Sequence, residues 1–192
     1  MTADKRDNYL EKYIILMSGY NDRLKDLQIL YLLDRDQYIY KMSRVRFHAI
    51  KALGKMANVI IWGPNWRYYN KDLTMNENIA KLESKINRAV DVVICYKPSI
   101  IKEFSKFKGL KVITYNEMWD EPYTLNEINE AQPDLVICHH KNDMIRYQTG
   151  IYKDLSYHFR FHHIHHSGEK TIFYDRKCQK EFDVLLCGSI GK

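Results

Sequence analysis

The chain has 192 residues, of which 45% are hydrophobic and 28% are charged, which suits a single domain with a sizeable core. The mean hydropathy is −0.49, and the longest apolar run near the N-terminus is the short stretch from Tyr13 to Met17. We therefore expect neither a secretory signal nor a membrane span, which need about 7–15 and about 20 apolar residues. The net charge of +6 is spread along the chain and forms no basic block, so a nucleic-acid partner is not expected.

The predicted elements begin with an amphipathic helix in residues 1–27, and we expect this helix to pack on the domain. Its apolar residues recur at helical spacing and are Tyr9, Tyr13, Leu16, Tyr20, Leu24 and Leu27. Short apolar runs predict strands at 29–33 (ILYLL) and 59–62 (VIIW). Between these strands the residues Met42, Val45, Ala49, Leu53 and Met56 predict the buried stripe of a helix.

The second part of the chain continues the alternation. Thr74 and Glu77 have the spacing of a capping box that opens a helix. A strand at 91–95 is followed by a predicted helix that begins at Pro98 and ends at Gly109, and then by a strand at 112–115. Thr124 and Glu127 repeat the capping-box spacing ahead of a strand at 134–138, and residues 142–148 predict a last helix closed by Gly150.

A repeated unit gives the clearest indication of the fold. DVVIC at 91–95, DLVIC at 134–138 and DVLLC at 183–187 each place an acidic residue before a continuous apolar run. Such runs are typical of strands buried on both faces, as in parallel sheets. Strands that alternate with single helices predict an α/β domain with a doubly wound, mainly parallel, Rossmann-like sheet and helices on both faces.

The cysteines bear on the cellular compartment. The four are Cys95, Cys138, Cys178 and Cys187; no two form a CxxC pair, and three end apolar runs. A small hydrophobe packs well at such positions, so we expect no disulfide framework. The sequence thus favours a reducing, cytoplasmic location.

Ligands of open α/β sheets bind beyond the carboxyl ends of the strands, and polar residues follow several of the predicted strands. The turn Gly63-Pro64-Asn65-Trp66 combines an amide with an indole on which a sugar ring can stack; alternatively, Trp66 only covers the sheet edge. Glu117 or Asp120 can act as general base towards a hydroxyl, unless the segment is a solvated loop in which Asp120 caps the next helix. The expected substrate-binding residues are Asn65, Trp66, Lys97, Asn116, His139 and His140.

Histidines suggest a metal site by number, but their spacing does not support one. His158, His162, His163, His165 and His166 crowd one segment. In an extended segment His162 and His166 would share one face and His163 and His165 the other, and no cysteine or carboxylate stands among them at zinc-like spacing. We expect no metal. His139 and His140 can contact a substrate oxygen, or can be capping or exposed histidines.

The motifs of several enzyme classes are missing. The first predicted strand is followed by Asp34-Arg35-Asp36 in place of a GxGxxG turn, and the sequence contains no P-loop and no GxSxG elbow. A dinucleotide cofactor is therefore not expected.

The order of elements, the GPNW turn, VITYNEMWDEP, PDLVICHH, and HHIHHSGEKTIFYD followed by FDVLLCGS together resemble GT-B-fold glycosyltransferases of the spore-maturation and group 1 type. The resemblance covers roughly residues 28–192. It implies an amino-terminal, acceptor-side half of an enzyme that transfers a sugar from a nucleotide-sugar co-substrate to a sugar or glycan acceptor.

The resemblance also implies a domain division. Residues 28–166 form the acceptor-side domain, and 167–192 form a crossover segment and the first strand of a second, truncated domain that would bind the donor. Without that donor domain we expect the chain to be inactive. A non-catalytic, Rossmann-like module that binds a glycan or a partner chain is the alternative.

Overall fold

The protein was analysed as a computed structural model, which describes residues 24, 26–36, 44–96, 98–115, 121–155 and 159–164, apart from the side chains of 44–48 and 121. The expected helix at 1–27 therefore lies almost wholly outside the described residues, although Leu24 and Leu27 pack against the core. The expected start of a second domain at 167–192 also lies outside them. No helix in the described part of the chain is both long and apolar enough to cross a membrane.

Six strands form one sheet in which every pairing is parallel. They are β1 (Gln28–Leu32), β2 (Asn58–Trp62), β3 (Val92–Cys95), β4 (Leu110–Tyr115), β5 (Leu135–Cys138) and β6 (Arg160–His163), and their order across the sheet is β2-β1-β3-β4-β5-β6. The prediction of a parallel Rossmann-like sheet is confirmed, and all five strands expected in it are present within two residues of their expected bounds.

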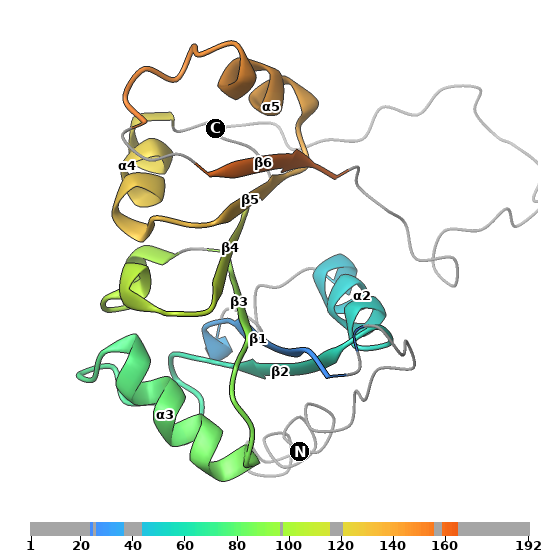
Figure 1. Ribbon diagram of the computed structural model, residues 1–192, viewed down its shortest axis with the longest axis vertical. Helices are drawn as coiled ribbons and strands as arrows, with labels where there is room; N and C mark the ends of the chain where they lie inside the picture. The colour runs from blue at the N-terminus through green and yellow to red at the C-terminus, as the bar shows by residue number, and fades with distance from the viewer. Residues whose placement is uncertain are drawn as a thin grey trace, which may run out of the picture.

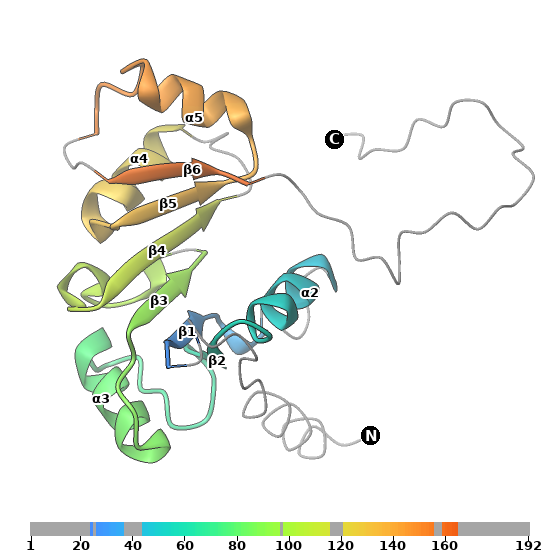
Figure 2. The same ribbon diagram turned by 45° about the vertical axis from the view of Figure 1, so that its right-hand side comes forward.

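Helices cover both faces of the sheet. α3 (Met75–Ile86) and α4 (Glu121–Ala131) lie on one face, and α2 (Arg44–Leu53) lies on the other (Figures 1 and 2). This arrangement follows from right-handed crossovers, because the chain moves from β1 to β2 in one direction and from β2 to β3 and onwards in the opposite direction. α5 (Lys141–Gln148) packs beside β5 and β6.

The aspartates of the repeated unit hold the amino ends of neighbouring strands. The carboxylate of Asp91, just before β3, accepts a 2.8 Å hydrogen bond from the backbone N–H of Gln28 at the start of β1. Asp134, just before β5, accepts an identical 2.8 Å bond from the backbone N–H of Lys111 in β4. The Lys111 ammonium lies 3.4 Å from the same Asp134 oxygen. Each aspartate thus satisfies a strand-end donor that would otherwise be buried without a partner.

Three local predictions need correction. Residues 98–109 form two short 3₁₀ turns, η2 (Pro98–Ile100) and η3 (Phe104–Lys106), in place of an α-helix, although Ile101, Phe104 and Phe107 are buried as expected. α4 begins at Glu121, so the second expected capping box lies inside the helix, with both of its side chains buried. Of the side chains of α2 that the structure describes, Ile50 is buried and Leu53 is half-buried against the core, while Ala49 is exposed.

The sixth strand arises from the histidine-rich segment. Phe161 is buried and stacks against Tyr147 of α5 with ring centroids 5.2 Å apart. The Tyr147 hydroxyl donates to the carbonyl of Phe159 at 2.8 Å, just before the strand. The aromatic residues therefore provide the apolar packing of this strand onto the domain.

Candidate functional site

The reversal of strand order marks where a ligand is expected. The connections turn back between β1 and β3, which lie side by side in the sheet, and open α/β sheets bind ligands outside the carboxyl ends of the strands at such a switch point. The arrowheads of β3 to β6 point to one edge in Figure 2. Three groups of polar side chains lie along this edge.

The first group joins the segments that follow β1 and β2. The Asn65 amide donates to a carboxylate oxygen of Asp34 at 2.7 Å, and the Trp66 indole N–H donates to the carbonyl of Leu33 at 2.9 Å. Asn65 is exposed and has a left-handed backbone with φ 64°, a conformation that asparagine tolerates. Trp66 is only 7% exposed, so its ring covers the ends of the strands and offers little surface to a ligand.

The second group surrounds a buried carboxylate beside the carboxyl ends of β3 and β4. Glu127 of α4 is 4% exposed. One of its oxygens accepts a 3.0 Å hydrogen bond from the hydroxyl of Tyr115, the last residue of β4. The other accepts hydrogen bonds from the Ser99 hydroxyl in η2 and, at 3.4 Å, from the Tyr123 hydroxyl. The Ser99 and Tyr123 oxygens lie 3.3 Å apart.

Within the second group, the surroundings of Tyr115 keep its phenol protonated. Burial raises the pKa of the Tyr115 phenol well above its ordinary value of 10.0, and the neighbouring Glu127 charge raises it further. The tyrosine therefore remains a hydrogen-bond donor at any physiological pH. The structure adds this cluster to the candidate site, although the sequence predicted none of its members as site residues. The capping-box spacing of Thr124 and Glu127 had suggested a helix start, and no local pattern marks Ser99 or Tyr115.

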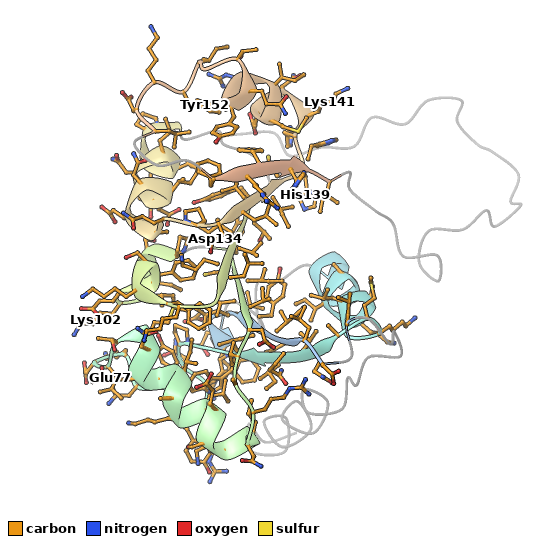
Figure 3. All side chains as sticks on the ribbon, viewed as in Figure 1. Glu77, Lys102, Asp134, His139, Lys141 and Tyr152 are labelled. Carbon is orange, nitrogen blue, oxygen red and sulfur yellow. The ribbon has the colours of Figure 1, made fainter. Side chains whose placement is uncertain are left out.

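The third group ties β5 to β6. Because a carbonyl can only accept, the ring nitrogens are the donors in both of its histidine bonds. His139 Nδ1 donates to the carbonyl of Ile164 at 2.9 Å, and His163 Nε2 donates to the carbonyl of His139 at 3.2 Å. His140 is the exposed N-cap residue of α5, and its backbone N–H donates to the Cys138 sulfur at 3.3 Å. Figure 3 shows His139 and Lys141 by the carboxyl end of β5.

The expected site residues are not all brought together. Asn65 and Trp66 follow β2, whereas His139 and His140 follow β5, and three strands lie between β2 and β5. At the spacing of neighbouring strands this separation is about 19 Å, so a single small acceptor cannot contact both pairs. Lys97, Asn116, Glu117 and Asp120 lie outside the described residues.

Among the residues that the structure describes, no group of three or more histidine, cysteine or acidic side chains converges as a metal site would require. His158, His165 and His166 are not among the described residues.

Comparison of the chain with protein-family models, with curated protein sequences and with solved structures gives no match in any of the three.

Proposed function

We propose that this chain supplies the acceptor-side domain of a glycosyltransferase, and that a nucleotide-sugar donor is bound by a second domain. The observation that carries the proposal is the all-parallel sheet whose carboxyl edge, on both sides of the switch point, bears carboxylate, amide and hydroxyl groups. Such groups suit a hydroxyl-rich ligand, because each can exchange hydrogen bonds with a sugar. The resemblance to GT-B enzymes supports the same assignment.

Within this proposal the general base is Glu117 or Asp120, in the segment that joins β4 to α4. A carboxylate there can take the proton of an acceptor hydroxyl as its oxygen attacks the donor sugar, while the nucleotide leaves with the bonding electron pair. Asn65 and His139 would then serve acceptors that extend along the edge. Cys95 and Cys138 are buried thiols outside any disulfide, which together with a nucleotide-sugar donor favours a cytoplasmic enzyme.

A non-catalytic module that binds a glycan or a partner chain is the second candidate. It is favoured by the internal hydrogen bonds of Asn65, Trp66 and His139, which tie loops and strand ends to one another. Side chains engaged in this way hold a surface rigid and do not by themselves transfer protons.

The test measures nucleotide release and sugar transfer from a panel of nucleotide sugars to glycosides. The purified 192-residue chain is compared with the product of the whole reading frame in which its sequence lies. Transfer should require the donor domain, because catalysis depends on orienting donor and acceptor together. Efficient turnover by the 192-residue chain alone, or no turnover by the whole product with any donor, would contradict the proposal.

In an active protein, Glu117→Gln or Asp120→Asn should lower turnover by about 10²–10⁴-fold if that residue is the base. Unchanged turnover in both folded variants would refute the assignment of the base. Glycoside binding without any transfer would instead support the non-catalytic module.

A further inference from the structure

The Glu127 cluster has a property that the proposed function does not use. A glutamate is almost never this deeply buried unless it is paired, yet its partners among the described residues are the neutral hydroxyls of Ser99, Tyr115 and Tyr123. A carboxylate that is buried for a structural role is usually paired with a cation. A carboxylate held by hydroxyls, as it is among the described residues, is instead a strong acceptor.

The protons of the cluster can be accounted for one by one. An ionised carboxylate only accepts, and each hydroxyl has a single proton to donate. Tyr115 and Ser99 direct their protons to the two Glu127 oxygens. The Tyr123 proton goes to Glu127 or to Ser99, which both lie within 3.4 Å of its oxygen. No hydroxyl proton of the cluster is left for an outside group.

The outer side of the cluster can therefore only accept hydrogen bonds. Ser99 and Tyr123 are exposed, Tyr123 by 50%, so the remaining lone pairs of their oxygens are within reach of a ligand. A ligand hydroxyl that donates to either oxygen gains from the carboxylate behind it, because hydrogen bonds in such a chain polarise one another. A phosphate or carboxylate would meet lone pairs and a negative charge.

We propose that Ser99 and Tyr123, backed by Glu127, form a subsite that binds a hydroxyl of the acceptor sugar as a hydrogen-bond donor and rejects anionic groups. This inference rests on the proposed function in one respect only, namely that the ligand is the sugar to which the enzyme transfers. Tyr123 lies in the first turn of α4, three residues along the chain from Asp120. A sugar whose reacting hydroxyl meets the 116–120 segment can thus place another hydroxyl in the subsite.

The experiment titrates the ¹⁵N-labelled 192-residue chain with methyl glucoside, methyl galactoside and methyl mannoside and follows the backbone amides by NMR. At least one glycoside should shift the amides of Ser99 and Tyr123. Ser99→Ala should weaken that binding by about 10–100-fold, the range for a hydrogen bond supported by a charge, whereas Ser84→Ala, at an exposed serine of α3, should leave it unchanged. Because Ser99 is exposed and the Tyr115 and Tyr123 hydroxyls still donate to Glu127, its truncation should preserve the fold.

Two further arms test the chemistry. Inorganic phosphate should not shift the same amides, because it would meet lone pairs and a negative charge; phosphate binding there would overturn the assignment of a subsite that rejects anions. Glu127→Gln turns an acceptor into a group that also donates, which frees the hydroxyl protons to point outwards. If this variant folds, its preference for glycosides over phosphate should fall at least tenfold.

The results separate the two proposals. Glycoside binding that depends on Ser99, without sugar transfer by the product of the whole reading frame, would support the proposed subsite and refute the proposed transferase function. No shift at Ser99 and Tyr123 with any of the three glycosides, or equal binding by Ser99→Ala, refutes the subsite whatever the transfer assay gives.

Discussion

Gly63 directly follows β2 and lies against the backbone that follows β1, so a larger residue does not fit at this position. Its φ is +151°, and a Cβ built there would lie 2.7 Å from the carbonyl oxygen of Leu33. The contact is with backbone that is held by the Trp66 indole and cannot move aside cheaply. Gly63→Ala should therefore lower the free energy of unfolding by about 2–4 kcal/mol, from backbone strain and overpacking together.

Urea denaturation followed by circular dichroism measures this loss. Gly150→Ala is the matched control, because Gly150 also has a positive φ of +69° but has open space around the position of a Cβ. It should cost about 1 kcal/mol, the backbone contribution alone. Equal losses in the two variants would show that the close approach to Leu33 does not matter.

Cys138 should be chemically inert in the folded protein. Burial is the main cause that raises the pKa of its thiol from the ordinary 9.0 to about 12. The hydrogen bond from the His140 N–H lowers this pKa, whereas Asp143, to which the thiol donates at 3.4 Å, raises it further. Because the thiolate is the reactive form, alkylation by iodoacetamide at pH 8 should be about a thousandfold slower than for a free thiol.

Mass spectrometry of the peptide that contains Cys138 measures the rate, with urea-unfolded protein as the reference. Asp143→Asn removes the charge and should speed the reaction. A proton held more tightly by the folded state also means that stability falls as the pH rises from about 9 to about 12. Rapid alkylation of the native protein at pH 8 would contradict the burial of this thiol.

At the scale of elements, α3 shows a helix start that local chemistry alone specifies. The backbone N–H of Thr74 donates to the Glu77 carboxylate at 2.7 Å, and the backbone N–H of Glu77 donates to the Thr74 hydroxyl at 3.3 Å, so the predicted capping box is confirmed. Hydrogen bonds from the Thr74 side chain and backbone lower the pKa of Glu77.

Thr74→Ala should lower the free energy of unfolding by about 1 kcal/mol at pH 7. A lowered folded-state pKa stabilises above the unfolded-state value of about 4.3 and ceases to do so as the pH falls below it. The variant should therefore differ less from the parent at pH 3 than at pH 7. Ser84→Ala on the same helix should change stability by less than about 0.5 kcal/mol. A loss independent of pH would argue against the bond to Glu77.

The strands also show what a local pattern can predict. The DVVIC and DLVIC units predicted buried strands correctly, and the structure adds the reason for their aspartates, whose carboxylates accept from backbone N–H groups near the amino ends of adjacent strands. The failed capping box at Thr124 and Glu127 shows the limit of such patterns. The same spacing begins a helix in α3 but lies inside the helix in α4, where Glu127 accepts hydrogen bonds from hydroxyls of η2, β4 and α4 itself. Two of these three donors come from segments distant along the chain.

For the whole molecule, strand order should set the pattern of local stability. β1, β3, β4 and β5 each pair on both sides within the sheet, whereas β2 pairs with β1 alone and β6 pairs with β5 alone among the described strands. Backbone amides of the central strands should therefore exchange with solvent most slowly, and those of the edge strands β2 and β6 fastest among the strands. Hydrogen–deuterium exchange with peptide-level mass spectrometry tests this, and a β6 as protected as β3 would contradict it.

The amino-acid sequence by itself determined the class of the fold, because apolar runs and amphipathic spacing report directly on which residues must leave water. It also predicted five of the six strands and the cap of α3. The tertiary structure alone decided that three strands separate Asn65 from His139, that Trp66 is covered, and that Glu127 meets Ser99 and Tyr115. These facts depend on which strands become neighbours, and a periodic pattern along one segment carries information about burial but none about the partner that buries it.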